Sequence, residues 1–201
     1  MTCRKALICA LLICVLSAPA IPQTRGRGVS EVYSDVLNVL FPMDVESKPY
    51  YVKFILRFHD TESQLALIVY PGTESELVSH SLENVKGQDL YTLVSEMLDK
   101  NASVKAEEIA AKVRVRTTRS AVDYKAVEPA LNELKSIRIS PYFQTRIFLD
   151  EYSAYDFWFS SGQESVHYRI CGNSSKSDAQ DKLVRWMTKF RADSASIVKH
   201  S

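Results

Sequence analysis

Cys171 and His167 are the two residues whose types suggest covalent chemistry most directly, because a thiolate beside an imidazole forms the nucleophile and base of many hydrolases. They are four positions apart in a segment whose alternating pattern predicts a strand, so both side chains point to one face. Four strand residues span roughly 13 Å, which exceeds hydrogen-bond reach. The pair is therefore no dyad by itself, and His59 or His80 would have to reach Cys171 from another strand.

Cys171 is the one cysteine in the body of the chain, since Cys3, Cys9 and Cys14 lie in the first fourteen residues. An intrachain disulfide framework is therefore excluded there. Three roles stay open for Cys171: an inert, partly buried side chain, which we favour, an interchain disulfide that makes a homodimer, or a reactive thiol.

The sequence contains no motif that identifies an enzyme. HExxH, GxSxG, paired CxxC, a phosphate-binding GxxxxGK[ST] and a GxGxxG that opens a helix are all missing. An exported hydrolase with dispersed catalytic groups stays the alternative interpretation. It predicts a concave pocket in which His59, His80 or His167 converges with Cys171, Asp156 or Glu164, with at least two of these groups within about 4 Å of each other. We expect no cofactor and no metal site.

A basic segment crosses the middle of the chain. Residues 102–146 hold nine bases and five acids, whereas residues 30–101 hold twelve acids and five bases. We expect Arg114, Arg116 and Arg119 to line one side of a strand. One interpretation is that they bind an anionic glycan, a lipid head group or an acidic partner. The interpretation that we favour is intramolecular: the basic segment faces the acidic segment across the sheet, or the arginines lie on a solvated strand face that protects a sheet edge.

Aromatic residues are dense between Tyr142 and Tyr168. Trp158 points away from its neighbours Phe157 and Phe159 on a predicted strand, so one of the two faces must be covered by something other than the primary core. We favour helices on both faces. Otherwise Trp158, with Tyr155 nearby, is an exposed platform for a sugar or a protein.

The first twenty residues have the layout of a secretory signal peptide. Arg4 and Lys5 precede the apolar run 6–16, and Ala18 and Ala20 are the small residues before a cleavage site after Ala20. The apolar run is shorter than the roughly 20 residues that cross a bilayer, so the mature chain is expected to have no integral span. The expected location is secreted or periplasmic.

Export adds one further pattern to consider. Asn101-Ala102-Ser103 and Asn173-Ser174-Ser175 match the N-glycosylation sequon, which matters in a glycosylating host and does not bear on the choice of function.

Periodicity predicts the elements of the mature chain. A helix begins at Ser30 as its cap, strands cover 50–59, 64–70 and 76–82, and helices cover 90–98 and 104–111. A basic strand covers 112–118, and Pro129 lies in the first turn of a helix that ends near Ile137. Three more strands cover 145–149, 154–160 and 165–171, and Ser177 with Gln180 caps the last helix.

This order predicts an α+β fold in one domain, residues 30–201, after a flexible basic segment 21–29. We expect six to seven mainly antiparallel strands, as two three-stranded meanders plus the basic strand, packed with four to five helices. The chain has a formal net charge of +1 in 201 residues, and −1 without the leader, so nucleic acid is not an expected partner. The interpretation is an exported, non-catalytic binding protein with an unknown protein or glycan partner.

Overall fold

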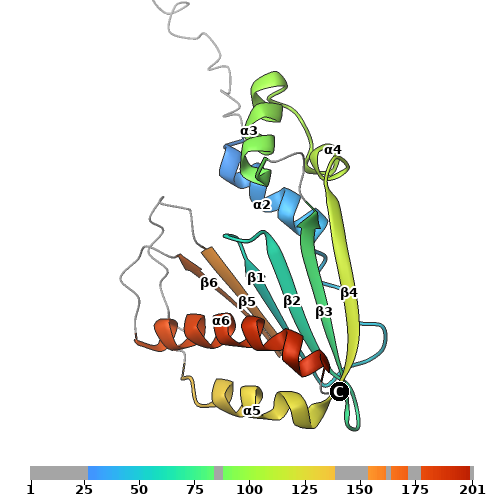
Figure 1. The fold of residues 1–201 in the computed structure, drawn as a ribbon. Helices are drawn as coiled ribbons and strands as arrows, with labels where there is room; N and C mark the ends of the chain where they lie inside the picture. The colour runs from blue at the N-terminus through green and yellow to red at the C-terminus, as the bar shows by residue number, and fades with distance from the viewer. Residues whose placement is uncertain (1–26, 84–87, 139–153, 162–163, 172–177, 200–201) are drawn as a thin grey trace, which may run out of the picture.

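The computed structural model describes residues 27–83, 88–138, 154–161, 164–171 and 178–199. Six strands form one antiparallel sheet in the order β4-β3-β2-β1-β5-β6 (Figure 1), and the predicted α+β class is confirmed. The elements in chain order are α2 (Val29–Leu40), β1 (Val52–Phe58), β2 (Ser63–Val69), β3 (Glu74–Glu83), α3 (Leu90–Lys100), α4 (Ala106–Ala110), β4 (Arg114–Asp123), α5 (Tyr124–Lys135), β5 (Ala154–Ser161), β6 (Glu164–Cys171) and α6 (Asp178–Lys199).

The period-two alternation of β1 separates the two faces of the sheet. Phe54, Leu56 and Phe58 enter a core cluster with residues of α5 and α6, and we call this side the inner face. Ile55 and Arg57 point to the opposite side, which we call the outer face, and both are also buried. The sheet is therefore covered on both sides along its central strand.

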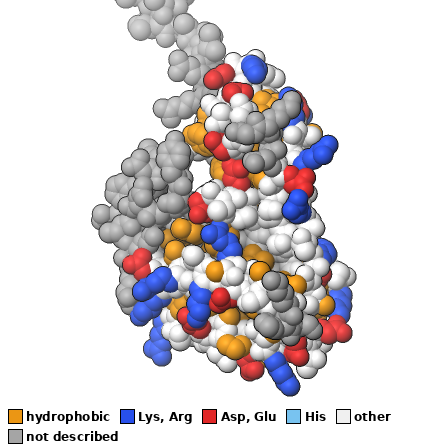
Figure 2. All heavy atoms as spheres, in the orientation of Figure 1, with side chains coloured by type: hydrophobic (Ala, Val, Ile, Leu, Met, Phe, Trp, Pro, Cys, Tyr) orange, Lys and Arg blue, Asp and Glu red, His pale blue; other side chains and the backbone are white. Residues whose placement is uncertain are grey.

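Helices α5 and α6 cover the inner face (Figure 1). The indole Nε1 of Trp186 in α6 donates to the carbonyl oxygen of Ala130 in α5 at 2.8 Å, so a buried donor is satisfied where the two helices meet. Figure 2 shows that this side of the molecule carries interspersed acidic and basic side chains.

The outer face is covered unevenly. Helices α2, α3 and α4 form their own apolar cluster, which Leu82 of β3 and Val115 of β4 join from the sheet. Val45, in the segment between α2 and β1, packs on Ile55 and Ile68. On β5 and β6 the outer face is more open, because His167 and Arg169 of β6 are exposed.

Several element boundaries differ from the sequence predictions. Helix α2 begins at Val29 with Gly28 as its N-cap, so Ser30 lies inside the helix instead of capping it. Helix α5 begins at Tyr124, where the carboxylate of Asp123 accepts from the amide of Lys125 at 2.9 Å. Pro129 is thus inside α5 and not in its first turn. The prediction used Pro129 to place the start of the helix, because proline is common in the first helical turn. The helix instead starts after Asp123, whose side chain caps it.

The basic strand is longer than expected, ten residues that end at Asp123, because it pairs along the whole of β3. The predicted strand 145–149, the cap at Ser177 and the leader 1–20 lie outside the described residues. Among the helices that the structure describes, none has the length and apolar character needed to cross a membrane.

Candidate functional site

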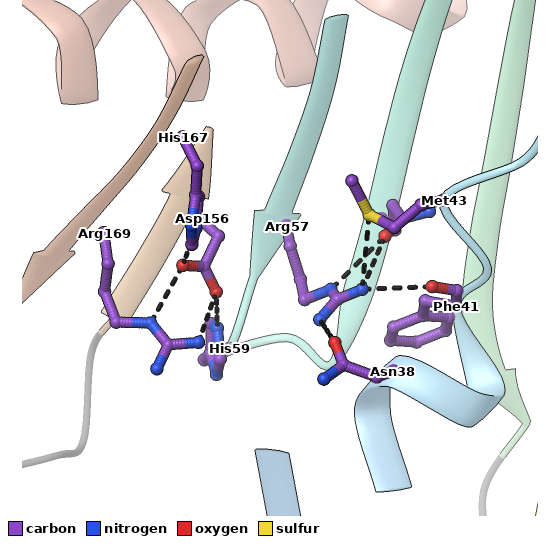
Figure 3. A network of polar contacts seen from close by, with 9 residues as sticks. Asn38, Phe41, Met43, Arg57, His59, Asp156, His167 and Arg169 are labelled. Atoms are coloured by element: carbon purple, nitrogen blue, oxygen red, sulfur yellow. Dashed lines mark hydrogen bonds and ion pairs between the residues drawn. The ribbon is translucent and has the colours of Figure 1, made fainter. Parts of the chain in front are cut away.

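Asp156 of β5 is the centre of a polar cluster on the outer face (Figure 3). Its carboxylate is 0% exposed and accepts from Nε2 of His59 at 2.6 Å and from Nε2 of His167 at 2.9 Å. Arg169 donates through Nε at 2.9 Å and through Nη2 at 3.1 Å. Each carboxylate oxygen therefore accepts two hydrogen bonds. We call these four residues the Asp156 cluster.

The register of the strands assembles the cluster. Asp156 is opposite Arg169 on β6 and opposite Arg57 on β1, while His167 is opposite Trp158. Residues two apart on a strand share a face, so His167 and Arg169 lie side by side over β5. His59 follows the last residue of β1 and reaches Asp156 from the other side.

The cluster keeps Asp156 ionised. Burial by itself raises the pKa of a carboxyl, but the hydrogen bonds from His167, His59 and Arg169 outweigh it and hold the pKa of Asp156 far below its usual range. The carboxylate does not exchange a proton near neutral pH. It fixes the two imidazole rings, because a hydrogen bond from Nε2 to a carboxylate requires the proton on Nε2.

Arg57 is buried beside this cluster, with 1% of the residue exposed. Its Nη1 donates to Oδ1 of Asn38 at 2.7 Å and its Nη2 to the carbonyl oxygen of Phe41 at 3.0 Å, so it fastens the end of α2 to the sheet (Figure 3). Oε1 of Gln64 accepts from Nε at 3.2 Å. Burial lowers the pKa of Arg57 to about 10, and the nearby Asp156 opposes that shift. The guanidinium remains charged at neutral pH.

The two aromatic residues proposed for binding lie on opposite faces. Trp158 is half-buried on the outer face, where the His167 ring stacks on it with centroids 4.5 Å apart and planes at 4°, and where Cζ of Arg57 lies 4.9 Å from its centroid. Protein groups from β6 and β1 therefore flank the indole. Tyr155 is on the inner face, edge-on to Phe58 at 6.1 Å.

The three arginines proposed for anion binding do not share one side of β4. Arg114 and Arg116 are at even positions, while Arg119 points to the opposite face, so the prediction of one common side is wrong. Arg119 donates to the carbonyl oxygen of Val45 at 2.7 Å and pairs with Glu76 at 3.1 Å.

The other two arginines differ in their pairing. Arg116 pairs with Glu83 at 3.1 Å on the neighbouring strand, and Arg114 is exposed. Strand β4 is at the edge of the sheet opposite β6. The basic strand and Trp158 therefore do not form one continuous surface.

Cys171 is the last residue of β6, opposite Ala154 of β5. The position of its side chain lies outside the described part of the chain. Its three roles, including the interchain disulfide of a homodimer, stay predictions.

The hydrolase alternative foresaw part of the cluster, since it asked whether a histidine meets Asp156. His59 and His167 do, while His80 instead bonds Oγ1 of Thr117 at 2.9 Å. Sequence reasoning missed Arg57 and Arg169. The available signal was charge at every second position of otherwise apolar strands, which predicts polar groups gathered on one covered face.

No group of three histidine, cysteine or acidic side chains among the described residues is arranged to hold a metal ion. Two hollows lie away from the Asp156 cluster. One of about 250 Å³ is lined by α5 and α6, and one of about 390 Å³ is lined by α2 together with residues 102–107.

Comparisons of the chain with protein-family models, curated proteins and solved structures find no match. Function is therefore inferred from the chemistry of the chain's own residues.

Proposed function

We propose that this chain is an exported, non-catalytic binding protein whose partner places an anionic group on the outer side of β5 and β6. The observation that carries the proposal is the Asp156 cluster, in which a buried and fully bonded carboxylate holds His167 and Arg169 while each of those side chains stays 44% exposed.

Charge favours an anionic group. Among the described residues that meet here, Arg57 and Arg169 carry two positive charges and Asp156 carries one negative charge. The excess positive charge lies partly under low-dielectric protein, where attraction is stronger than in bulk water. An acidic side chain, a uronate or a sulfate would be drawn to this position.

Rigidity favours binding. Arg169 is held by two hydrogen bonds and His167 by one hydrogen bond and by its stack on Trp158. Side chains that are already ordered lose less conformational entropy when a partner docks. As in the sequence analysis, the proposed partner is a protein or a glycan.

A hydrolase is the second candidate, and the 2.6 Å contact between His59 and Asp156 favours it. In a catalytic triad, a buried carboxylate fixes the tautomer and orientation of the histidine that acts as the base. Against this, no hydroxyl or thiol is hydrogen-bonded to either ring within the described residues, and the hydrogen bonds of both imidazoles in that part of the chain go to Asp156.

The test of binding uses two variants that each add one negative charge. Ser165→Glu places a carboxylate on the outer face two residues from His167 and touches no member of the cluster. Thr118→Glu makes the same change on β4, at the far edge of the sheet. We expect wild-type protein to bind acidic members of a glycan and peptide array, Ser165→Glu to lose that signal at least tenfold, and Thr118→Glu to keep it.

Equal binding by both variants contradicts the proposed surface. Turnover of chromogenic ester, glycoside or peptide substrates that disappears in His59→Asn, with unchanged binding, would instead establish the hydrolase. Export is tested separately by mass spectrometry of the protein recovered from the growth medium. We expect the mass of a chain that begins at Ile21.

A further inference from the structure

We propose that Asn101 is an N-linked glycosylation site of the exported chain. The sequon Asn101-Ala102-Ser103 forms the turn between α3 and α4. The inference goes beyond the binding function and shares with it only the premise of export.

The turn presents the acceptor to solvent. All three sequon residues are exposed, and Asn101 is the C-cap of α3 with an extended backbone, φ −152° and ψ 100°. Its main-chain amide donates to the carbonyl oxygen of Met97 at 2.9 Å, its main-chain oxygen accepts from the amide of Val104 at 3.1 Å, and its Oδ1 accepts from the amide of Ser103 at 3.0 Å. The turn is therefore anchored through those three atoms.

The nitrogen that glycosylation uses is the remaining polar atom. In the part of the chain that the structure describes, Nδ2 of Asn101 donates to no protein group. A sugar on Nδ2 thus displaces no hydrogen bond of the fold. Attachment requires neither unwinding of α3 nor exposure of a buried residue.

The transfer needs one co-reactant, a lipid-diphosphate-linked oligosaccharide in the secretory pathway. The Nδ2–H bond breaks and its proton goes to a base of the transferase. A bond forms from Nδ2 to the anomeric carbon of the first sugar, the bond from that carbon to the diphosphate oxygen breaks, and the lipid diphosphate leaves. No oxidation or reduction takes place.

The position is compatible with the proposed binding surface. Helices α3 and α4 lie beyond the ends of β3 and β4, whereas β5 and β6 are at the other side of the sheet (Figure 1). A glycan at Asn101 therefore leaves the outer side of β5 and β6 uncovered.

The test expresses the full chain with its own leader in cultured mammalian cells, and recovers it from both medium and lysate. Peptide N-glycosidase converts a glycosylated asparagine to aspartate, so mass spectrometry of the peptide that contains Asn101 measures occupancy directly. We expect conversion at Asn101 in wild type and a shift of one glycan on gels.

Substitution at Ala102 supplies the matched pair of variants. Ala102→Pro destroys the sequon, because proline is not tolerated between the asparagine and the serine. The amide of Ala102 makes no main-chain hydrogen bond in the described part of the chain, and the extended Asn101 suits a following proline. Ala102→Ser keeps the sequon. We expect Ala102→Pro to lose the glycan at Asn101 and Ala102→Ser to keep it.

The second sequon is removed by Asn173→Gln, so that a remaining shift reports on Asn101 alone. Three results overturn the proposal: an unmodified peptide at Asn101 in secreted protein, a glycan that depends solely on Asn173, or a chain that stays in the lysate without any glycan. None of these results bears on the anionic surface, which Ser165→Glu tests independently.

Discussion

Arg57 and Asp156 are directly opposite each other on β1 and β5 and carry opposite charges, yet each is bonded to other groups. Arg57 turns toward α2 and bonds neutral oxygens of Asn38, Phe41 and Gln64. Asp156 turns toward β6 and the end of β1. The two residues therefore have separate roles on the outer face. Arg57 fastens α2 to the sheet, and Asp156 orders the side chains of the Asp156 cluster.

Replacing Arg57 with methionine should destabilise the fold strongly. Arg57→Met keeps most of the side-chain length but leaves the buried oxygens of Phe41 and Gln64 without their donor, and each such loss costs about 1–3 kcal/mol. The oxygen of Asn38 also loses its donor, but Asn38 is exposed and water can replace the bond. For two buried acceptors we expect the free energy of unfolding to fall by about 2–6 kcal/mol in urea titrations. Arg114→Met on the exposed edge strand is the control, with a change within about 0.5 kcal/mol. Equal effects of the two variants would show that Arg57 does not anchor α2.

Removal of the charge of Asp156 should destabilise the fold in a pH-dependent way. Asp156→Asn leaves Arg169 without its buried counter-charge, and we expect a loss of about 3–5 kcal/mol at pH 7. The folded-state pKa is far below the unfolded value of about 3.9, so the stabilisation is complete above that pH and is lost as the pH falls below it.

Wild type and Asp156→Asn should therefore converge in stability on acidification below pH of about 4. Urea titrations between neutral and acidic pH measure this. The exposed Asp44→Asn is the control and should follow wild type throughout. A constant difference at all pH values would contradict the low pKa.

His80 should make the fold sensitive to mild acid. It is buried, its Nε2 has no partner among the described residues, and burial together with the charge of Arg119 lowers its pKa. The unfolded chain takes up the proton first as the pH falls below about 6.5, so stability declines from there downward. His80→Gln, which stays neutral, should flatten the dependence of the unfolding free energy between neutral pH and pH of about 5. If the unfolding free energy of His80→Gln depended on pH as steeply as that of wild type, His80 would not be the source of the acid sensitivity.

The state of Cys171 can be measured without perturbing the sheet. Because an inert thiol is the favoured interpretation, we expect exported protein to run as a monomer on non-reducing gels, and Cys171→Ser to change neither stability nor mobility. A dimer band that disappears with reductant and in Cys171→Ser would establish the covalent homodimer.

The elements themselves were largely predictable from sequence, because side-chain periodicity is a local property of the chain. Alternation located β1, β-rich runs between turn residues located β2 and β3, and the apolar stripes of α3 and α6 located those helices. The predictions failed where two local signals competed. Pro129 was taken to begin α5, whereas Asp123 caps the helix one residue before its start.

The candidate site depended on pairing that no local signal contains. The hydrogen bond between His59 and Asp156 joins residues 97 positions apart, and it exists because β5 pairs with β1 on the side that β2 leaves open. Alternation predicts which charged residues share a face of one strand, but it does not predict which strand lies beside that strand in the sheet. The sequence by itself thus determined the strands, the helices and their apolar faces, while the sheet order, a long-range choice made by packing of the whole chain, decided that two imidazoles and a guanidinium meet one buried carboxylate.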